Sequence, residues 1–361
     1  MVMRCHSSIL FCFFLFSISR CFGQQTLIAG TISDANTREV LPLATIFINN
    51  TTISAASAVN GQYSLRNIPA GPIEVVVSYI GYESSRTKLI VHDGDRLLLN
   101  IKLTPSMVEL PGAQVSAKRD KDWEKQYRKF EKIFLGENPT NAKIINPGII
   151  NFQEIDKGKV LLAEASETLE IVNPGLGYRI FYYMREFQSD KESFSIVGDM
   201  RFEELKEKDD IKMKQWTKNR RDIYLGSLRH LLVSLVQNKI SEEGFKLYVD
   251  LPGFNESRRA SIFSMNKGVV PLKLDSVVSP GARTGEFKIF FKKRVEVHYV
   301  HRLASIKTYN DIPWQVGWID PTKDVVEVDE NGTILNLAHF ITSGYLSNAR
   351  IASLLPSDYR P

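Results

Sequence analysis

The sequence contains one closely spaced pair of histidines, His298 and His301. Imidazole nitrogens bind zinc and other metals, so such a pair is a candidate metal site. A helix would bring both rings to one face, but Val295, Val297 and Tyr299 alternate as in a β-strand. A strand would send the two rings to opposite faces, because their spacing is odd. The sequence therefore predicts ordinary strand histidines here and no bound metal.

Other polar clusters lack the spacing that catalysis requires. Ser227 and His230 lie close in the chain, but the Gly-x-Ser-x-Gly turn of a serine hydrolase is absent. Asp93–Asp95 and Asp329–Gly332 lack the alternating oxygens and final Glu of a calcium loop, so we interpret both as turns. No Gly-Lys-Ser/Thr phosphate-binding loop occurs. The sequence predicts no catalytic residue, no cofactor and no metal ligand.

Three tryptophans are the candidate ligand contacts of this chain. Trp216 lies in the run from Glu203 to Asp222, where both signs of charge mix as on a solvated face. Trp314 and Trp318 lie close together near two prolines. Exposed aromatic rings supply large contact areas for a sugar or a peptide. The alternative for all three is that their rings are buried anchors.

Charge and cysteine content narrow the class of partner. The formal net charge of the 361-residue chain is +5, and it falls to +3 without Arg4 and Arg20 of the first 23 residues. A balance so close to neutral argues against nucleic acid as the main partner. All three cysteines, Cys5, Cys12 and Cys21, lie near the start, so the rest of the chain forms no disulfide. No later segment is apolar enough to span a bilayer as a helix.

Residues 1–23 have the pattern of an export signal. Arg4 precedes an apolar run from Ile9 to Ile18, which is too short to span a membrane. The small residues Cys21 and Gly23 favour cleavage between Gly23 and Gln24. A retained signal or a lipid anchor at Cys21 is the alternative. We therefore expect an exported protein, located in the periplasm or associated with the outer membrane.

Residues 24–104 have the pattern of a β-sandwich with about seven short strands. Alternate residues are apolar from Ile73 to Tyr79 and again from Leu97 to Leu103. Asn60 and Gly61 suit a tight hairpin turn, and Pro69–Pro72 interrupts strand pairing. These features predict an all-β fold for this part of the chain.

Several short motifs follow one another in this segment, namely Gly30–Asp34, Leu41–Thr45, Asn60–Leu65, Ile68–Gly71 and Ser78–Glu83. In this order they resemble the carboxypeptidase regulatory-like family, a transthyretin-like β-sandwich. The resemblance implies an exported accessory domain, of the kind that also precedes outer-membrane receptors of the TonB-dependent type. It does not imply peptidase activity, because no histidine in the chain has Glu three residues later, as a zinc carboxypeptidase requires.

The rest of the chain is predicted to be a linker followed by an α+β region. Residues 105–120 contain two prolines and little periodicity, as expected of a linker. In residues 121–361, an apolar stripe from Trp123 to Phe134 predicts a helix that ends at Gly136. A second stripe, from Tyr224 to Leu235, predicts another helix. The segments between and after them favour antiparallel strands, with two or three helices in all.

The sequence therefore predicts a non-enzymatic envelope protein. The sandwich would mediate protein contacts, or would position residues 121–361 at the outer membrane, with an envelope or outer-membrane protein as partner. Gly175–Tyr183 and Tyr224–His230, together with the Trp123 helix and Asn146–Pro147, resemble an envelope family of unknown activity, which implies export alone. Two alternatives stay open: a glycan- or peptide-binding protein that uses exposed aromatic residues, and a hydrolase of unfamiliar type.

Overall fold

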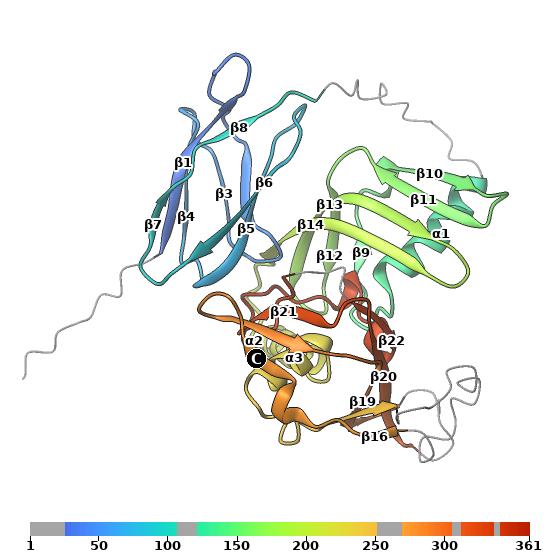
Figure 1. The fold of residues 1–361 in the computed structure, drawn as a ribbon. Helices are drawn as coiled ribbons and strands as arrows, with labels where there is room; N and C mark the ends of the chain where they lie inside the picture. Colours follow the sequence, from blue (N-terminus) through green and yellow to red (C-terminus); the bar gives the residue numbers. More distant parts are fainter. Residues whose placement is uncertain (1–25, 107–120, 251–268, 305–311, 336–339) are drawn as a thin grey trace, which may run out of the picture.

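The computed structural model describes residues 26–106, 121–250, 269–304, 312–335 and 340–361 (Figure 1). The predicted export signal, with its cleavage point between Gly23 and Gln24, lies outside the described residues, as does most of the predicted linker. Three separate clusters of buried hydrophobic side chains organise the described part, one in the sandwich and two in residues 121–361. No helix in this part is long and apolar enough to cross a bilayer.

The N-terminal unit is a β-sandwich, as predicted. Its strands are β1 (Leu27–Asp34), β2 (Thr45–Ile48), β3 (Ser54–Ala56), β4 (Gln62–Arg66), β5 (Gly71–Ser78), β6 (Ser85–Val91), β7 (Arg96–Leu98) and β8 (Ile101–Leu103). One sheet has the order β4-β1-β7, with β8 also paired to β1, and the other has the order β3-β2-β5-β6. The predicted alternation is confirmed in β5, where Ile73, Val75 and Val77 face the core between the sheets.

The middle unit is an antiparallel sheet with a helix on one face. It comprises α1 (Lys121–Leu135), β9 (Lys143–Ile144), η1 (Pro147–Ile149), β10 (Ile150–Ile155), β11 (Val160–Ala165), β12 (Leu169–Asn173), β13 (Tyr178–Ser189) and β14 (Phe194–Glu204). The predicted stripe of α1 packs on this sheet: Phe130 contacts Phe187, and Phe134 contacts Tyr182, both edge-on. The helix therefore covers one face of the sheet and makes no contact with the other face.

The C-terminal unit is built from α3 and two further sheets. Its elements are α3 (Leu228–Val236), β15 (Phe245–Asp250), β16 (Val269–Pro271), η3 (Leu274–Ser276), β17 (Val278–Pro280), β18 (Glu286–Phe290), β19 (Val295–Leu303), β20 (Trp314–Pro321), β21 (Val325–Asp329) and β22 (Phe340–Gly344). The sheets have the orders β16-β15-β19-β20-β22 and β17-β18-β21. Leu231 and Leu235 of α3 pack with Val297 of β19 in a common core. The predicted α+β class of residues 121–361 is thus confirmed.

The second predicted helix is in fact two helices. Tyr224 is the last residue of α2 (Asp210–Tyr224), and α3 begins only at Leu228. Gly226 adopts a φ of 79°, which ends the helical path. The Ser227 side chain then accepts the His230 N–H and caps α3. The apolar stripe continued across this break, so periodicity alone did not reveal it.

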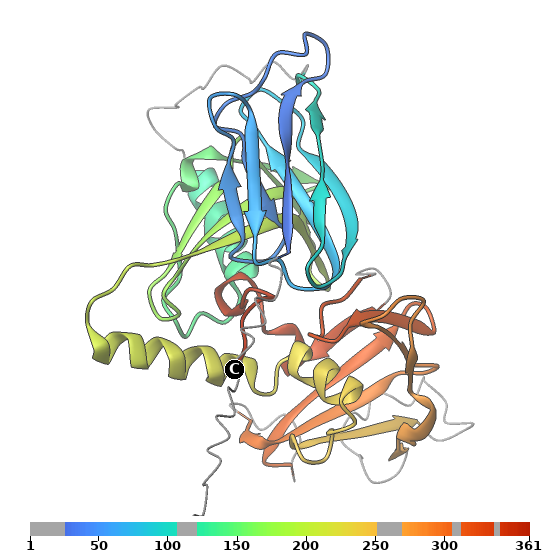
Figure 2. The same cartoon turned by 90° about the vertical axis from the view of Figure 1, so that its left-hand side faces the viewer.

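Residues 345–361 form a segment that we call the C-terminal strap. It includes η5 (Tyr345–Ser347) and η6 (Ile351–Ser353). Leu346 lies in the core of the C-terminal unit, whereas Ile351 and Ala352 lie in the core of the middle unit. Ser357 donates its N–H to the Asn50 carbonyl of the sandwich. In Figure 2 the dark red strap lies at the centre, where the three units meet. One short segment thus contacts all three units.

Candidate interdomain docking site

Asp199 is a fully buried carboxylate on the outer face of the middle sheet. Its neighbour Met200 packs toward the core of the middle unit, and Gly198 lies against the core residue Tyr182. Because side chains alternate along a strand, β14 points Asp199 away from that core, toward the sandwich. A buried carboxylate is costly unless it is paired and hydrogen-bonded. The site is therefore defined by what neutralises Asp199.

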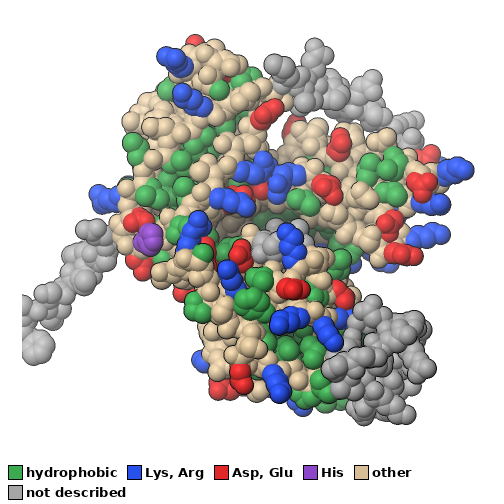
Figure 3. Space-filling view, in the orientation of Figure 1, with side chains coloured by type: hydrophobic (Ala, Val, Ile, Leu, Met, Phe, Trp, Pro, Cys, Tyr) green, Lys and Arg blue, Asp and Glu red, His purple; other side chains and the backbone are tan. Residues whose placement is uncertain are grey.

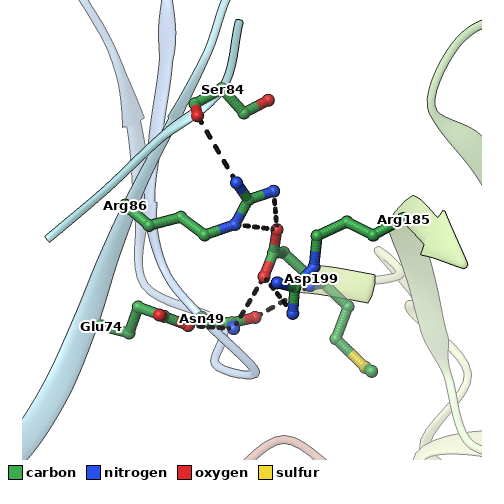
Figure 4. A network of polar contacts seen from close by, with 7 residues as sticks. Asn49, Glu74, Ser84, Arg86, Arg185 and Asp199 are labelled. Carbon is green, nitrogen blue, oxygen red and sulfur yellow. Dashed lines mark hydrogen bonds and ion pairs between the residues drawn. The ribbon is translucent and has the colours of Figure 1, made fainter. Parts of the chain in front are cut away.

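Two arginines from different units supply the positive charge. Arg86 of β6 donates from Nε to Asp199 Oδ2 at 2.7 Å, and its Nη2 lies 2.5 Å from the same oxygen (Figure 4). Arg185 Nη2 lies 3.6 Å from Asp199 Oδ1. Lys and Arg side chains gather where the sandwich meets the middle unit (Figure 3). The ion pair with Arg86 therefore crosses the junction between two units.

A β-bulge in β13 presents Arg185 at this junction. The register of β13 against β14 shifts between Met184 and Glu186. Before the bulge Tyr182 points to the core, and after it Phe187 does so, although five positions separate them. An extra residue in one strand re-aims the side chains around it. The bulge thus leaves Arg185 on the outer face, beside Asp199.

The β2–β3 loop of the sandwich pairs with the edge of the middle sheet. The Asn50 N–H donates to the Met200 carbonyl at 2.7 Å, and the Phe202 N–H donates to the Thr51 carbonyl at 2.9 Å. Within the described sheet, β14 pairs only with β13, so its other edge would otherwise present unpaired backbone groups. The loop therefore covers an exposed strand edge.

Asn49 connects this loop to the buried carboxylate. Its side-chain oxygen accepts the Met200 N–H at 2.9 Å, and its Nδ2 donates to Asp199 Oδ1 at 3.3 Å. The same Nδ2 donates to Glu74 Oε2 at 2.8 Å. Backbone and side-chain contacts of one asparagine thus fix the register of the loop on β14 and complete the shell around Asp199.

Two apolar side chains of the sandwich face the middle unit instead of the sandwich core. Phe47 and Val76 are fully buried although their strand neighbours, such as Ile46 and Val75, occupy the core between the sheets. The Phe47 ring stacks on Tyr183 with ring centres 5.0 Å apart. Burying a large apolar side chain contributes roughly 1.5–3 kcal/mol. We call Phe47, Asn49, Val76, Arg86 and Asp199 the docking site.

Trp216, one of the predicted ligand contacts, is a buried anchor. Its indole Nε1 donates to the Pro174 carbonyl at 2.7 Å. Its ring lies so close to Gly177 that a Cβ at that position would come within 2.3 Å of the ring. Since only 6% of Trp216 is exposed, its face is not available to a sugar or a peptide. It attaches α2 to the middle unit.

Trp314 and Trp318 share the outer face of the five-stranded sheet with Glu296 and His298. Trp314 Nε1 donates to His298 Nδ1 at 3.0 Å, and Trp318 Nε1 donates to Glu296 Oε2 at 3.2 Å. His298 Nε2 lies 2.8 Å from Glu296 Oε1. Because Nδ1 accepts a hydrogen bond, Nε2 carries the proton, and neither nitrogen is free for a metal or a substrate. The structure thus brings two of the three candidate tryptophans together.

His301 lies on the opposite face of β19 from His298 and lines a cleft of about 690 Å³ between the middle and C-terminal units. The charged residues that line the cleft are Arg221, Asp222, Glu243 and Arg302, so its charges balance. Among the described residues, no group of three histidine, cysteine or carboxylate side chains is placed to hold a metal ion. The cleft therefore has no evident preference for a cation or an anion.

His230 lies behind this cleft and is held in its neutral form. Its Nδ1 accepts the Gly226 N–H at 3.0 Å, so its Nε2 carries the proton and donates to Glu243 Oε2, also at 3.0 Å. Burial lowers the pKa of His230 below its ordinary value of 6.5, against the opposing effect of Glu243. With both nitrogens occupied, this histidine fixes the start of α3 and is not placed to act as a base.

Comparison with solved structures finds proteins that are similar only over a fraction of this chain. Catechol 1,2-dioxygenase from Acinetobacter sp. ADP1 is 18% identical over 24% of this chain and 54% of its own, with a TM-score of 0.20. The group B streptococcus pilus 2b backbone protein is 15% identical over 24% and 43%, with a TM-score of 0.20. The C-terminal domain of the shaft pilin SpaA from Lactobacillus rhamnosus GG is 16% identical over 23% and 98%, with a TM-score of 0.19.

This chain thus spans about half the length of the first two of these structures. A search of curated proteins finds no match. A family model gives the clearest result: residues 28–115 match the CarboxypepD_reg-like domain. This match confirms the resemblance drawn from the motifs between Gly30 and Glu83. The N-terminal β-sandwich is therefore a carboxypeptidase regulatory-like domain.

Proposed function

We propose that this chain is an exported, non-enzymatic envelope protein. Its sandwich docks on residues 121–361 and positions them at the outer membrane by contacting a protein partner. The observation that carries the proposal is the docking site. One surface of the sandwich packs on the middle unit of the same chain, where Arg86 pairs with the fully buried Asp199. A sandwich fixed in this way presents its opposite end in one orientation.

That opposite end exposes three aliphatic side chains on neighbouring loops, Leu43, Val59 and Ile80, which are 77%, 89% and 89% exposed. We call them the free end. They lie at the same end of these strands, because Thr45 of β2 pairs with both Ala56 of β3 and Ser78 of β5. A single exposed aliphatic residue is common on protein surfaces, whereas a group of them is typical of an interaction site. The free end is therefore the surface on which we place the partner.

The test is affinity purification of the tagged full-length protein from gently solubilised envelopes, with mass spectrometry of the co-eluting proteins. We expect one reproducible outer-membrane or export-system partner, which Leu43→Asp combined with Ile80→Asp removes. The matched control is Leu98→Asp, because Leu98 on β7 is 78% exposed but lies outside the free end. Recovery of the same partner with all three proteins, or of no partner at all, contradicts the proposal.

A second candidate function is glycan or peptide binding at the Trp314 and Trp318 face. The observation that favours it is the combination of two partly exposed indole rings with Glu296 and with the nearby cations Lys246 and Arg294. Its test is a glycan and peptide array probed with the wild type and with Trp314→Phe. Binding that is lost in the variant at unchanged thermal stability supports this function, and an empty array contradicts it.

A further inference from the structure

We propose that Pro356–Tyr359 of the strap act as a latch that locks the sandwich onto the middle unit, and that Arg229 of the C-terminal unit is the positioning residue that holds the latch closed. The inference goes beyond the proposed function, because it rests on the geometry of the docked units and not on any partner. It places the docking of the sandwich under the control of a third unit, which does not itself belong to the docking site.

The Arg229 guanidinium binds backbone carbonyls of the latch. Its Nη1 donates to the Pro356 carbonyl at 2.8 Å, and its Nη2 donates to the carbonyls of Ser357 and Tyr359 at 2.7 and 3.0 Å. Its Nε donates to the Asn331 carbonyl in the turn after β21 at 2.9 Å. A guanidinium has donors in a fixed planar fork, so these bonds fix the path of the latch relative to α3.

The other side of the latch binds the same sandwich loop that pairs with β14. The Ser357 N–H and hydroxyl both donate to the Asn50 carbonyl, at 2.7 and 3.0 Å. The Asp358 carboxylate accepts the Thr52 N–H at 3.2 Å and the Thr52 hydroxyl at 2.5 Å. The latch thus lies between Arg229 on one side and residues 50–52 on the other.

The conformation of Asn50 in this loop depends on hydrogen bonds to two different units. Its N–H donates to the Met200 carbonyl of the middle unit, and its carbonyl accepts from Ser357 of the latch. Asn50 has a φ of 61°, in the left-handed region that few residues other than glycine, asparagine and aspartate adopt. Removal of the latch leaves the Asn50 carbonyl without these partners and weakens the constraint on that conformation.

Loss of the latch affects the docking site through Asn49. Asn49 precedes Asn50 and holds both Met200 and the buried Asp199. If Asn50 leaves its left-handed conformation, the preceding residue Asn49 therefore moves away from Asp199. In this way a change at Arg229, on α3, is transmitted to the ion pair between Arg86 and Asp199 without any direct contact between them.

The experiment measures the distance between the sandwich and the middle unit in the exported form. Residues 24–361 contain no cysteine, so nitroxide labels at Lys102→Cys on β8 and Lys125→Cys on α1 are site-specific. Both lysines are exposed, so labels there do not disturb a core. Pulsed electron–electron double resonance then gives the distribution of distances. We expect one narrow distribution for the otherwise unchanged protein.

The latch is opened by Arg229→Ala and, independently, by Ser357→Pro. Proline at position 357 removes the N–H and the hydroxyl that bind Asn50, and Ser357 belongs to none of the three hydrophobic cores. We expect both variants to broaden the distribution and add longer distances. The control is Arg360→Ala: Arg360 is exposed, and its hydrogen bonds go to the Ser357 and Tyr359 carbonyls within the latch itself, so they do not join the latch to the sandwich or to α3. It should leave the distribution narrow.

Each outcome decides the proposal. A narrow, unshifted distribution for Ser357→Pro overturns the latch, whatever Arg229→Ala does to the stability of the C-terminal unit. A broad distribution for Ser357→Pro with a narrow one for a folded Arg229→Ala overturns the role of Arg229. Broadening by Arg360→Ala to the same extent also overturns the proposal, because it would show that any change in the strap has this effect.

Discussion

The sandwich residues of the docking site and those of the free end form two surfaces of one sandwich, and both draw on β2, β5 and their adjoining loops. In the docking site, Phe47 and Val76 are fully buried by another unit. At the free end, Leu43 and Ile80 are of equally apolar type but exposed. Residue type does not distinguish the two surfaces; what covers them does. The sandwich therefore has one apolar surface that is covered by its own chain and a second that is exposed.

Removal of the Phe47 ring should cause the largest change in stability of the variants considered in this comparison. Phe47→Ala deletes the stack on Tyr183 and leaves a cavity between two units. We expect the free energy of unfolding to fall by about 3–4 kcal/mol, as for other buried phenylalanines. Urea denaturation followed by fluorescence measures the change. Leu98→Ala, at an exposed position of the same sandwich, should change it by less than about 0.5 kcal/mol. Equal effects of the two substitutions would remove the distinction between the surfaces.

The sandwich core could be predicted from the sequence because alternation is a local property. Ile73, Val75 and Val77 recur at every second position, and that pattern is sufficient to assign the inner face. The docking face also has a local signal in the sequence. Phe47 lies between Ile46 and Ile48, and a strand without polar alternation is typical of burial on both faces.

The polar part of the docking site has no such local signal. Arg86 and Asp199 are 113 positions apart, and neither lies in a motif. Their pairing depends on how two separately folded units meet, which periodicity does not describe. The strap was missed for the same reason, since Leu346 and Ile351 belong to different cores. For Trp216, burial is decided by its fit against Gly177, a contact between distant segments.

Mild acidification should lower the stability of the C-terminal unit more than that of the docking site. No docking-site residue is a histidine, whereas α3 carries His230. Burial lowers the pKa of His230 below 6.5, so the unfolded chain binds this proton more readily than the folded chain. The stabilising contribution is complete above pH 6.5 and is lost as the pH falls through the folded pKa. The wild type should therefore lose stability on acidification.

The measurement is the thermal unfolding midpoint at neutral pH and at pH 5.5. His230→Gln keeps a donor for Glu243 and an acceptor for Gly226 but does not titrate. We expect its midpoint to fall less on acidification than that of the wild type. A variant with the same loss as the wild type would assign the acid sensitivity to other groups.

The smallest effect should come from an ion pair of the same chemistry outside the docking site. Arg179 Nη1 lies 3.2 Å from Glu170 Oε2, with side chains 43% and 35% exposed. Solvent weakens such a pair, so Arg179→Ala should lower the free energy of unfolding by less than about 0.5 kcal/mol. Urea denaturation under the conditions used for Phe47→Ala makes the comparison direct. A loss as large as that of Phe47→Ala would contradict the difference between covered and exposed surfaces.

The central claim, that the sandwich is fixed to the middle unit through Asp199, is tested most directly by a double-mutant cycle of Arg86→Ala and Asp199→Ala. The Asp199 side chain is fully buried and that of Arg86 is 29% exposed, so loss of either partner leaves a poorly solvated charge. We expect a coupling energy of about 2–3 kcal/mol between the two positions. A coupling energy below about 0.5 kcal/mol, the level of independent sites, would contradict the account.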